Sequence, residues 1–257
     1  YWASLCDIYI NDAFGTIHRC HASNLGITKN TKSAVGFLVE KELKELSKLD
    51  NPKRPYSIVL GGSKISDKIN LIKNLARKAD YLLIGGGMAF TFLKACGFNI
   101  GSSLCEKDQI AFCKDLLEKY PDKILLPIDV ITAKEIKENA KINERFLGEI
   151  EEDEIGLDIG KKTLEVWSGY LKDSKTIFWN GPMGYFEIDK FAKGTLGLCE
   201  IISKSKAYKV IGGGDTARAV TEMGYAKKMN HISTGGGASL TYLEGVKLEA
   251  LEVIDEK

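Results

Sequence analysis

The sequence lacks the features that identify several large classes of protein. No apolar run reaches the roughly 18 residues of a membrane span, and we expect no membrane partner. The 36 basic and 35 acidic residues leave a formal charge of +1. Without the basic excess typical of nucleic-acid binding, we expect no nucleic-acid partner. The six cysteines form no Cys-x-x-Cys pair, which is typical of reduced thiols and predicts a cytoplasmic location.

Proline is scarce and apolar residues are plentiful. Five prolines and a hydrophobic content of 44% predict a compact folded chain. The 257 residues suit one large α/β domain, or one domain with pieces of another. The chain begins with Tyr1 rather than Met, and residues 1–5 resemble the middle of an element. We therefore expect a fragment of a longer protein.

Glycine is abundant, and half of it is clustered. Five turns hold 13 of the 26 glycines, and each turn joins an apolar run, interpreted as a strand, to a helix-like stretch. In a parallel sheet the carboxyl ends of the strands meet at one edge, where ligands of open α/β sheets bind. Glycine permits close backbone approach, and a helix start offers free N–H groups to a phosphate. The turns are residues 61–64, 85–87, 180–184, 212–216 and 234–237.

Strands and helices alternate from residue 56 onward. This order predicts an α/β fold, a Rossmann-like parallel sheet with helices on both faces. Before it we predict a strand within residues 7–15, a loop, and a helix over residues 33–49, where apolar residues recur at helical spacing. Residues 134–160 show no clear pattern, and we interpret the acidic residues 149–154 as solvated surface.

Two lysines follow the first glycine turn. Lys64 and Lys68 are four residues apart, so a helix starting near residue 63 or 65 would carry both on one face. Two such charges can bind the oxygens of a di- or triphosphate. Equally, both can be ordinary surface lysines. The spacing excludes a Walker A loop, which needs Gly-x-x-x-x-Gly-Lys-Ser/Thr.

The last two glycine turns each precede a predicted helix, and only the first of these two helices begins with a charged residue. Asp215 follows three glycines, where it can cap the helix or face a magnesium ion that bridges nucleotide phosphates. Residues 212–217 also fit a relaxed dinucleotide fingerprint, but no acidic residue stands about 20 positions later to bind a ribose. The turn at residues 235–237 is either an ordinary tight turn or a nest of amides for a phosphoryl group.

The three histidines indicate no catalytic centre. His18 and His21 flank Cys20 on a predicted loop, but a metal site there would lack a fourth ligand nearby. His231 precedes a predicted strand, and no Ser-His-Asp arrangement is indicated.

Six segments occur together in the order seen in one known family. They are DIYINDAFGT at residues 7–16 with His18-Arg19, GGSKISDK at 61–68, GGGMAF at 85–90, WNGP at 179–182, GGGDT at 212–216 and STGGGAS at 233–239. From about residue 3 to its end, the chain resembles the phosphoglycerate kinase family. The resemblance implies a monomeric, glycolytic enzyme that reversibly transfers a phosphoryl group between ATP and 3-phosphoglycerate, giving ADP and 1,3-bisphosphoglycerate, with Mg²⁺.

The resemblance also implies roles for individual residues. Lys64 resembles the lysine that follows the transferred phosphoryl group. Gly235, Gly236 and Gly237 resemble the loop that supports the transition state, and Asp215 matches the magnesium-binding aspartate. The implied nucleotide-binding residues are Gly62, Ser63, Lys64, Lys68, Gly85, Gly86, Leu157, Asn180, Pro182, Glu187, Gly214, Asp215 and Thr216.

The same resemblance divides the chain into four parts. These are residues 1–32 as a remnant of the phosphoglycerate-binding domain, 33–50 as the interdomain helix, 51–245 as the nucleotide-binding domain and 246–257 as a tail. Of the acid site only Arg19 would remain, so we expect a fragment that binds nucleotide but is nearly inactive alone. We also expect the opening strand to have no partner within the chain. The alternatives are a nucleotide-binding module without catalysis and a dinucleotide oxidoreductase.

Overall fold

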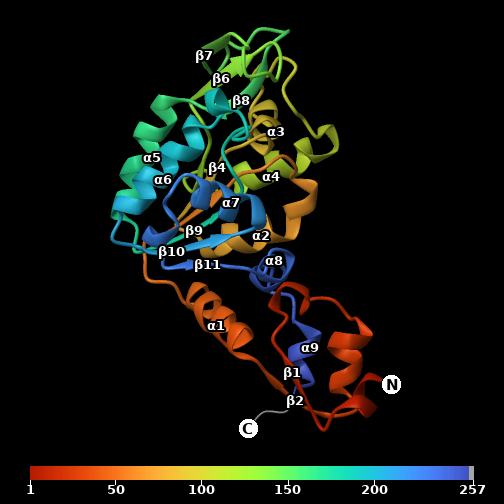
Figure 1. The fold of residues 1–257 in the computed structure, drawn as a ribbon. Helices are drawn as coiled ribbons and strands as arrows, with labels where there is room; N and C mark the ends of the chain where they lie inside the picture. The colour runs from red at the N-terminus through yellow and green to blue at the C-terminus, as the bar shows by residue number, and fades with distance from the viewer. Residues whose placement is uncertain (255–257) are drawn as a thin grey trace.

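A six-stranded parallel sheet forms the centre of the computed structural model, which describes residues 1–254. The strand order is β11-β10-β9-β3-β4-β5 (Figure 1). The predicted α/β fold is confirmed. The strands are β3 Tyr56–Leu60, β4 Tyr81–Ile84, β5 Ile124–Leu125, β9 Thr176–Asn180, β10 Tyr208–Gly212 and β11 His231–Ile232.

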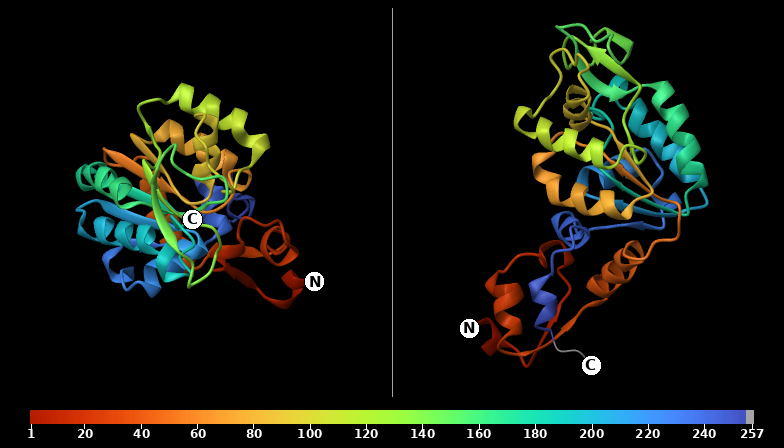
Figure 2. Two further views of the ribbon diagram at one scale, coloured as in Figure 1. Left: turned by 90° about the horizontal axis from the view of Figure 1, so that it is seen from above. Right: turned by 180° about the vertical axis from the view of Figure 1, so that it is seen from behind.

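Helices cover both faces of this sheet (Figure 2). One face packs against α2 Ile69–Lys78, α3 Met88–Ala95 and α4 Ile110–Lys119, and the other against α5 Lys161–Asp173, α6 Lys193–Lys204 and α7 Gly214–Glu222. α8 Gly237–Leu243 packs beside α2. The shorter helical turns are η1 Trp2–Leu5, η2 Phe14–Thr16, η3 Ala22–Gly26, η4 Ser47–Leu49, η5 Ser66–Lys68, η6 Lys107–Gln109, η7 Asp189–Phe191 and η8 Ala226–Lys228.

Strand β3 shows why the sheet needs two helical layers. Tyr56, Ile58 and Leu60 are fully buried in the core that α2–α4 share, whereas Val59 is fully buried in the core of α5 and α6. Successive side chains point to opposite faces of a strand. A strand that is buried at every position, as β3 is, therefore has to be covered on both sides.

A second, antiparallel sheet stands at one end of the molecule, in the order β7-β6-β8 (Figure 1). It consists of β6 Asp129–Ala133, β7 Ile142–Phe146 and β8 Ile155–Ile159. Our interpretation of residues 134–160 as patternless is therefore wrong. β7 is partly exposed along its length, so it lacks the apolar alternation of a half-buried strand, and pairing with β6 is what makes it a strand.

The opening segment also contains a strand pair. β1 Ile8–Asn11 runs parallel to β2 Lys32–Val35 and pairs with it over four residues. The prediction that the opening strand has no partner within the chain is wrong. The predicted helix over residues 33–49 is wrong at its start, because residues 33–35 belong to β2 and α1 spans Phe37–Leu46.

Asp12 determines where α1 begins. Its carboxylate accepts hydrogen bonds from the amides of Leu38 and Val39 at 2.7 and 3.0 Å. These are amides of the first helical turn, which have no partner within the helix. Gly36 makes the approach possible, since a Cβ atom there would lie 2.3 Å from Asp12 Cγ. The cap comes from 26 residues away, which is why helical spacing alone misplaced the helix start.

α1 connects the main sheet to a smaller part of the molecule that holds β1, β2, η3 and α9 Glu249–Glu252 (Figures 1 and 2). α9 packs against η3, and Cys20 Sγ lies 3.3 Å from a Glu249 carboxylate oxygen. The division into four parts stays a prediction, and residues 255–257 of the predicted tail lie outside the described residues. Within residues 1–254, no helix has the length and apolar character to cross a membrane.

The chain changes direction across the sheet between β3 and β9. From β3 it runs outward through β4 to β5, and from β9 it runs outward the other way through β10 to β11. Such a switch point opens a crevice at the carboxyl ends of the two central strands. At this point the Gly61 N–H donates to the Asn180 carbonyl at 2.8 Å, and Gly181 lies directly against Gly61 with a φ of +94°.

We expect Gly181→Ala to destabilise the fold by more than about 3 kcal/mol. A Cβ atom at this position would lie 2.2 Å from the Gly61 carbonyl carbon, and its φ is unfavourable for alanine. Gly169→Ala is the matched control, because Gly169 is exposed on α5 and its added Cβ would meet nothing within 4 Å. That substitution should stabilise the helix by about 0.5–1 kcal/mol. Urea denaturation measures both, and equal stabilities of the two variants would contradict the prediction.

Candidate functional site

Four of the five glycine turns meet around one cavity of about 310 Å³, which we call the polar cavity. Lys64, Asp215 and Gly236, from three different turns, all line it. The predicted convergence of these loops is therefore observed. The lining residues are Gly62, Ser63, Lys64, Asp67, Lys68, Asn180, Gly181, Pro182, Gly213, Gly214, Asp215, Thr216, Gly236, Gly237 and Leu240.

A second cavity of about 430 Å³, the apolar cavity, adjoins the first. Gly62, Ser63, Pro182 and Asp215 line both. The glycine turn at residues 85–87, which does not line the polar cavity, contributes Gly86 and Gly87 to the apolar cavity. The antiparallel sheet lines the apolar cavity through residues 155–157 of β8. The remaining lining residues are Gly86, Gly87, Leu104, Ile136, Ile155, Gly156, Leu157, Gly184, Tyr185, Phe186 and Glu187.

Backbone hydrogen bonds between turns fix the shape of both cavities. Gly62 N–H donates to the Pro182 carbonyl at 3.0 Å, and Gly86 N–H donates to the Met183 carbonyl at 3.1 Å. The Met88 N–H in turn reaches the Gly62 carbonyl at 3.0 Å. Because these donors and acceptors are backbone groups, the loops are held in register before any ligand binds.

The two lysines of the first turn differ in environment. Lys68 Nζ donates to the Gly61 carbonyl at 2.8 Å. Burial lowers the pKa of Lys68 to about 8, although the nearby charges of Asp215 and Asp67 act in the opposite direction. Lys64 is exposed and precedes η5, so one helix does not carry both lysines as the spacing suggested. Both ammonium-bearing side chains nevertheless line the polar cavity.

Glu106 was not recognised from the sequence, yet it holds the lysine turn. Its carboxylate accepts hydrogen bonds from the Ile65 and Ser66 amides and from the Ser66 hydroxyl. Burial raises the pKa of Glu106, but these bonds and the charge of Lys64 outweigh it, so the pKa is lowered overall. No local pattern indicates this contact, since the partners are 40 residues apart.

The start of α7 carries Asp215 into both cavities. The residue at the cap position is Gly213, with a φ of +87°, and Asp215 lies in the first turn of the helix. The interpretation of Asp215 as the helix cap is therefore wrong, and its exposed carboxylate is available to a ligand. The buried Thr216 hydroxyl accepts the Gly181 N–H at 2.6 Å and so ties α7 to the switch point.

The loop before α8 is supported by the opening segment. Gly235 lies against Phe14, whose ring carbon would be 2.3 Å from an added Cβ, and its N–H donates to the Ser233 hydroxyl. Gly237 lies beside the His18 ring, which would be 3.1 Å from an added Cβ. Gly236 and Gly237 therefore face the polar cavity while Gly235 supports them from behind.

A buried carboxylate of α1 braces the same loop. Glu42 is fully buried, and its Oε2 lies 2.8 Å from His231 Nε2. Its other oxygen accepts hydrogen bonds from the Thr234 amide and hydroxyl at 2.7 and 2.8 Å. Burial raises the pKa of Glu42, but these hydrogen bonds outweigh it and lower the pKa overall. The brace fixes the start of the loop that enters the polar cavity.

Of the remaining predicted residues, some line one of the two cavities and others line neither. Leu157 and Glu187 line the apolar cavity, and their assignment to an adenosine pocket stays a prediction. Gly85 lines neither cavity, because it is packed beneath them against the Met183 sulfur. Arg19 is exposed and also lines neither cavity. Asn180 lines the polar cavity, and its buried amide donates to the Gly212 carbonyl at 2.8 Å.

Arg218 is a further residue that the sequence did not reveal. From α7 it forms an ion pair of 2.7 Å with Glu187, and its guanidinium lies 4.7 Å from the centre of the Phe186 ring. It therefore links the helix that carries Asp215 to the rim of the apolar cavity.

Within residues 1–254, no three His, Cys, Asp or Glu side chains gather as a metal-binding group, His18 and His21 included.

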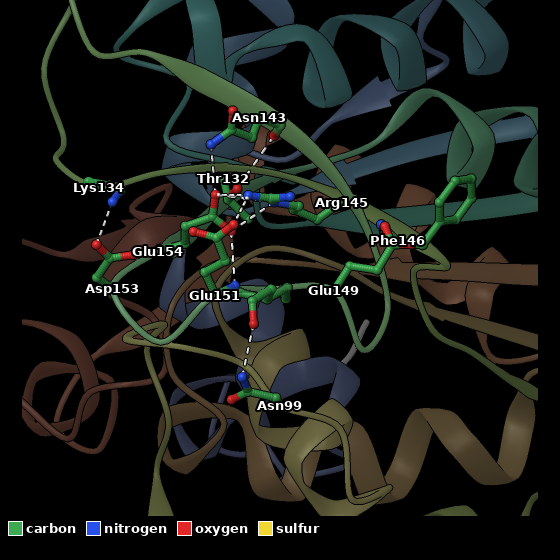
Figure 3. Close-up of polar contacts among 11 residues, drawn as sticks. Asn99, Thr132, Lys134, Asn143, Arg145, Phe146, Glu149, Glu151, Asp153 and Glu154 are labelled. Atoms are coloured by element: carbon green, nitrogen blue, oxygen red, sulfur yellow. Dashed lines mark hydrogen bonds and ion pairs between the residues drawn. The ribbon is translucent and has the colours of Figure 1, made fainter.

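A polar cluster braces the wall of the apolar cavity (Figure 3). Glu154, directly before β8, is fully buried and bonds to Arg145 and Asn143 of β7, with an ion-pair distance of 2.9 Å to Arg145. Burial raises the pKa of Glu154, but the Arg145, Glu151-amide and Asn143 bonds outweigh it and lower the pKa to about 2. The interpretation of residues 149–154 as solvated surface is therefore wrong for Glu154.

Comparison with known proteins agrees with this geometry. A profile of the phosphoglycerate kinase family matches residues 1–246. Phosphoglycerate kinases of Fusobacterium nucleatum and Listeria monocytogenes are 54% and 52% identical over the whole chain. The chain spans 66% and 65% of their lengths, slightly less than two thirds. The structure of phosphoglycerate kinase from Coxiella burnetii matches with a TM-score of 0.93 at 41% identity, covering 98% of this chain and 66% of that one. The Pyrococcus horikoshii enzyme matches at 0.86 and 31%, covering 98% and 65%.

We expect the contribution of Glu154 to the free energy of unfolding to be lost in acid. Because its pKa is about 2 in the folded chain and 4.5 ordinarily, the contribution is present above about pH 4.5 and is lost as pH falls toward 2. Urea denaturation at pH 6, 4 and 3 should show the difference between wild type and Glu154→Gln shrinking with acid. Glu138→Gln, at an exposed position of the same region, is the control. A difference that stays constant with pH would contradict the assignment.

Proposed function

Because the chain belongs to the phosphoglycerate kinase family, we propose that it forms the nucleotide-binding half of an enzyme acting between ATP and 3-phosphoglycerate. The reaction reversibly moves the terminal phosphoryl group and gives ADP and 1,3-bisphosphoglycerate. The observation that carries the proposal is the joint lining of one cavity by Lys64, Asp215 and Gly236. A glycolytic role and six unpaired cysteines favour the cytoplasm.

The two cavities divide the nucleotide between them. The adenosine lies in the apolar cavity, against Leu157 and Pro182, with the Glu187 carboxylate at its rim available to ribose hydroxyls. The phosphates extend into the polar cavity, toward Lys68 and the start of α7. Gly62, Ser63, Pro182 and Asp215 line both cavities, which supports a junction between adenosine and phosphates beside these residues.

Phosphoryl transfer at this site needs no general base. The acceptor oxygen belongs to a carboxylate, which is already ionised at neutral pH. Catalysis therefore depends on positioning the two substrates and on neutralising the negative charge of the transferred phosphoryl group. The exposed Lys64 is placed to follow the moving phosphoryl group, and the Gly236 and Gly237 backbone faces the same space.

Asp215 fits a magnesium ion shared with the nucleotide. Mg²⁺ prefers one or two carboxylates together with phosphate oxygens and water. The exposed Asp215 carboxylate at the edge of both cavities supplies one such ligand. When bound, the ion would neutralise phosphate charge and hold the phosphates in line.

The acid substrate would approach from the side of the smaller part of the molecule. The segment that carries Arg19 also contributes Phe14 and His18 to the support of the Gly235–Gly237 loop. Arg19 follows His18 directly and is exposed. We infer that Arg19 contributes one positive charge to binding of the acid, next to the loop that receives the phosphoryl group.

We expect the chain to bind Mg·ADP, and Asp215→Asn to weaken that binding by about tenfold. Binding of ADP without magnesium should change much less, because the lost carboxylate acts through the ion. Glu222→Gln, exposed at the other end of α7, is the matched control. Calorimetry measures all three proteins. NAD binding as tight as Mg·ADP binding would instead favour a dinucleotide oxidoreductase.

Lys68 should take up a proton when Mg·ADP binds above pH 8. Its pKa of about 8 leaves it mostly neutral there, whereas phosphate oxygens favour the charged ammonium. The affinity should therefore fall as pH rises through 8, with uptake on the order of one proton near pH 9. Calorimetry in buffers of different ionisation heat measures this uptake. Lys68→Arg, which stays charged, should show none; equal uptake by both proteins would rule out Lys68 as the source.

A further inference from the structure

The turn that carries Lys64 needs an anchor. Residues 61–65 have no regular secondary structure, and Lys64 itself is exposed at the rim of the polar cavity. The next two residues, Ile65 and Ser66, are both bonded to Glu106. The Ser66 amide lies 3.2 Å from Glu106 Oε2, and the Ser66 hydroxyl bonds to Oε1, so both carboxylate oxygens are engaged.

Glu106 is itself held in place. Its backbone N–H donates to the Thr91 hydroxyl at 3.1 Å, and Thr91 is 1% exposed within α3. Two residues earlier, Leu104 lines the apolar cavity beside Gly87. The segment 104–106 therefore contacts the proposed adenosine pocket at one end and the lysine turn at the other.

The same contact occupies two backbone amides close to the polar cavity. The Ile65 amide directly precedes η5 and the Ser66 amide belongs to its first residue; α2 begins only at Ile69, so neither of these two amides lies in its first turn. A carboxylate already occupies them, and its negative charge repels a second anion. At the start of α7 the helix cap is a glycine and the first-turn Asp215 is exposed, so a magnesium ion bound by Asp215 would offset the charge of this carboxylate toward phosphate.

We propose that Glu106 is a positioning residue for phosphoryl transfer. Its carboxylate holds the turn that places Lys64 at the polar cavity, and it occupies the Ile65 and Ser66 amides, so that Lys64, Lys68 and the start of α7 remain as the partners of the phosphates. This inference rests on the proposed function, because it takes Mg·ATP as the occupant of the polar cavity.

The test compares Glu106→Ala and Glu106→Gln with the wild-type chain and with Glu118→Ala. Glu118 is exposed on α4 and serves as the matched control. Calorimetry with Mg·ATP and with adenosine separates phosphate binding from base binding. Hydrogen exchange of the Ile65 and Ser66 amides reports on the anchor without any nucleotide.

We expect Glu106→Ala to weaken Mg·ATP binding by about tenfold, to leave adenosine binding within about twofold, and to speed exchange of the two amides by about tenfold. Glu106→Gln, which keeps the shape and one carbonyl acceptor, should fall between Glu106→Ala and wild type. The control should match wild type in every measurement.

Three results would overturn the inference. The first is that Glu106→Ala and Glu118→Ala bind Mg·ATP with equal affinity. The second is that Glu106→Ala loses adenosine binding and Mg·ATP binding to the same extent, which would indicate a merely structural role. The third is unchanged exchange of the Ile65 and Ser66 amides. A wild-type chain that binds neither ligand would instead overturn the proposed function, and the exchange measurement would still decide whether Glu106 anchors the turn.

Discussion

Close backbone contact between the ends of β3 and β9 is the constraint on which the site depends. Gly61 and Gly181 lie so near each other that neither tolerates a side chain, and their turns exchange hydrogen bonds with the turn that follows β4. This contact sets the distance between the two halves of the sheet at its switch point. Both cavities, and the mutual placement of Lys64 and Asp215, follow from it. The close packing of these two turns by itself requires glycine at both positions.

Much of this arrangement could be predicted, because it follows from local pattern and chain order. Largely apolar strands next to glycine turns indicate a parallel sheet, and a parallel sheet places those turns at one edge. The features that escaped prediction depend on partners far away in sequence. Asp12 caps α1 from 26 residues away, and Glu106 anchors a turn 40 residues distant. Glu154 pairs with Arg145 on a strand that pattern alone did not show.

Carboxylates recur as the means by which the site is held together. Glu42 fixes the loop before α8, Glu106 fixes the lysine turn, and Glu187 joins Arg218 of α7 at the rim of the apolar cavity. Each accepts hydrogen bonds or an ion pair from a segment that approaches the cavities. Because a charged acceptor gives stronger bonds than a neutral one, each can hold a loop that lacks regular structure. The polar cavity is otherwise lined largely by lysines, glycines and backbone, and the exposed Asp67 and Asp215 are the two acids among its lining residues.

The packing of α9 against η3 has a consequence for how the nascent chain matures. η3 leaves the ribosome about 225 residues before α9 does. At roughly 5–20 residues per second, the opening segment waits tens of seconds for this partner. Strands β3 to β10 can pair during that interval, whereas β11, the loop that enters the polar cavity and α9 emerge close together at its end. The opening segment and the polar cavity therefore gain their late partners at nearly the same stage of synthesis.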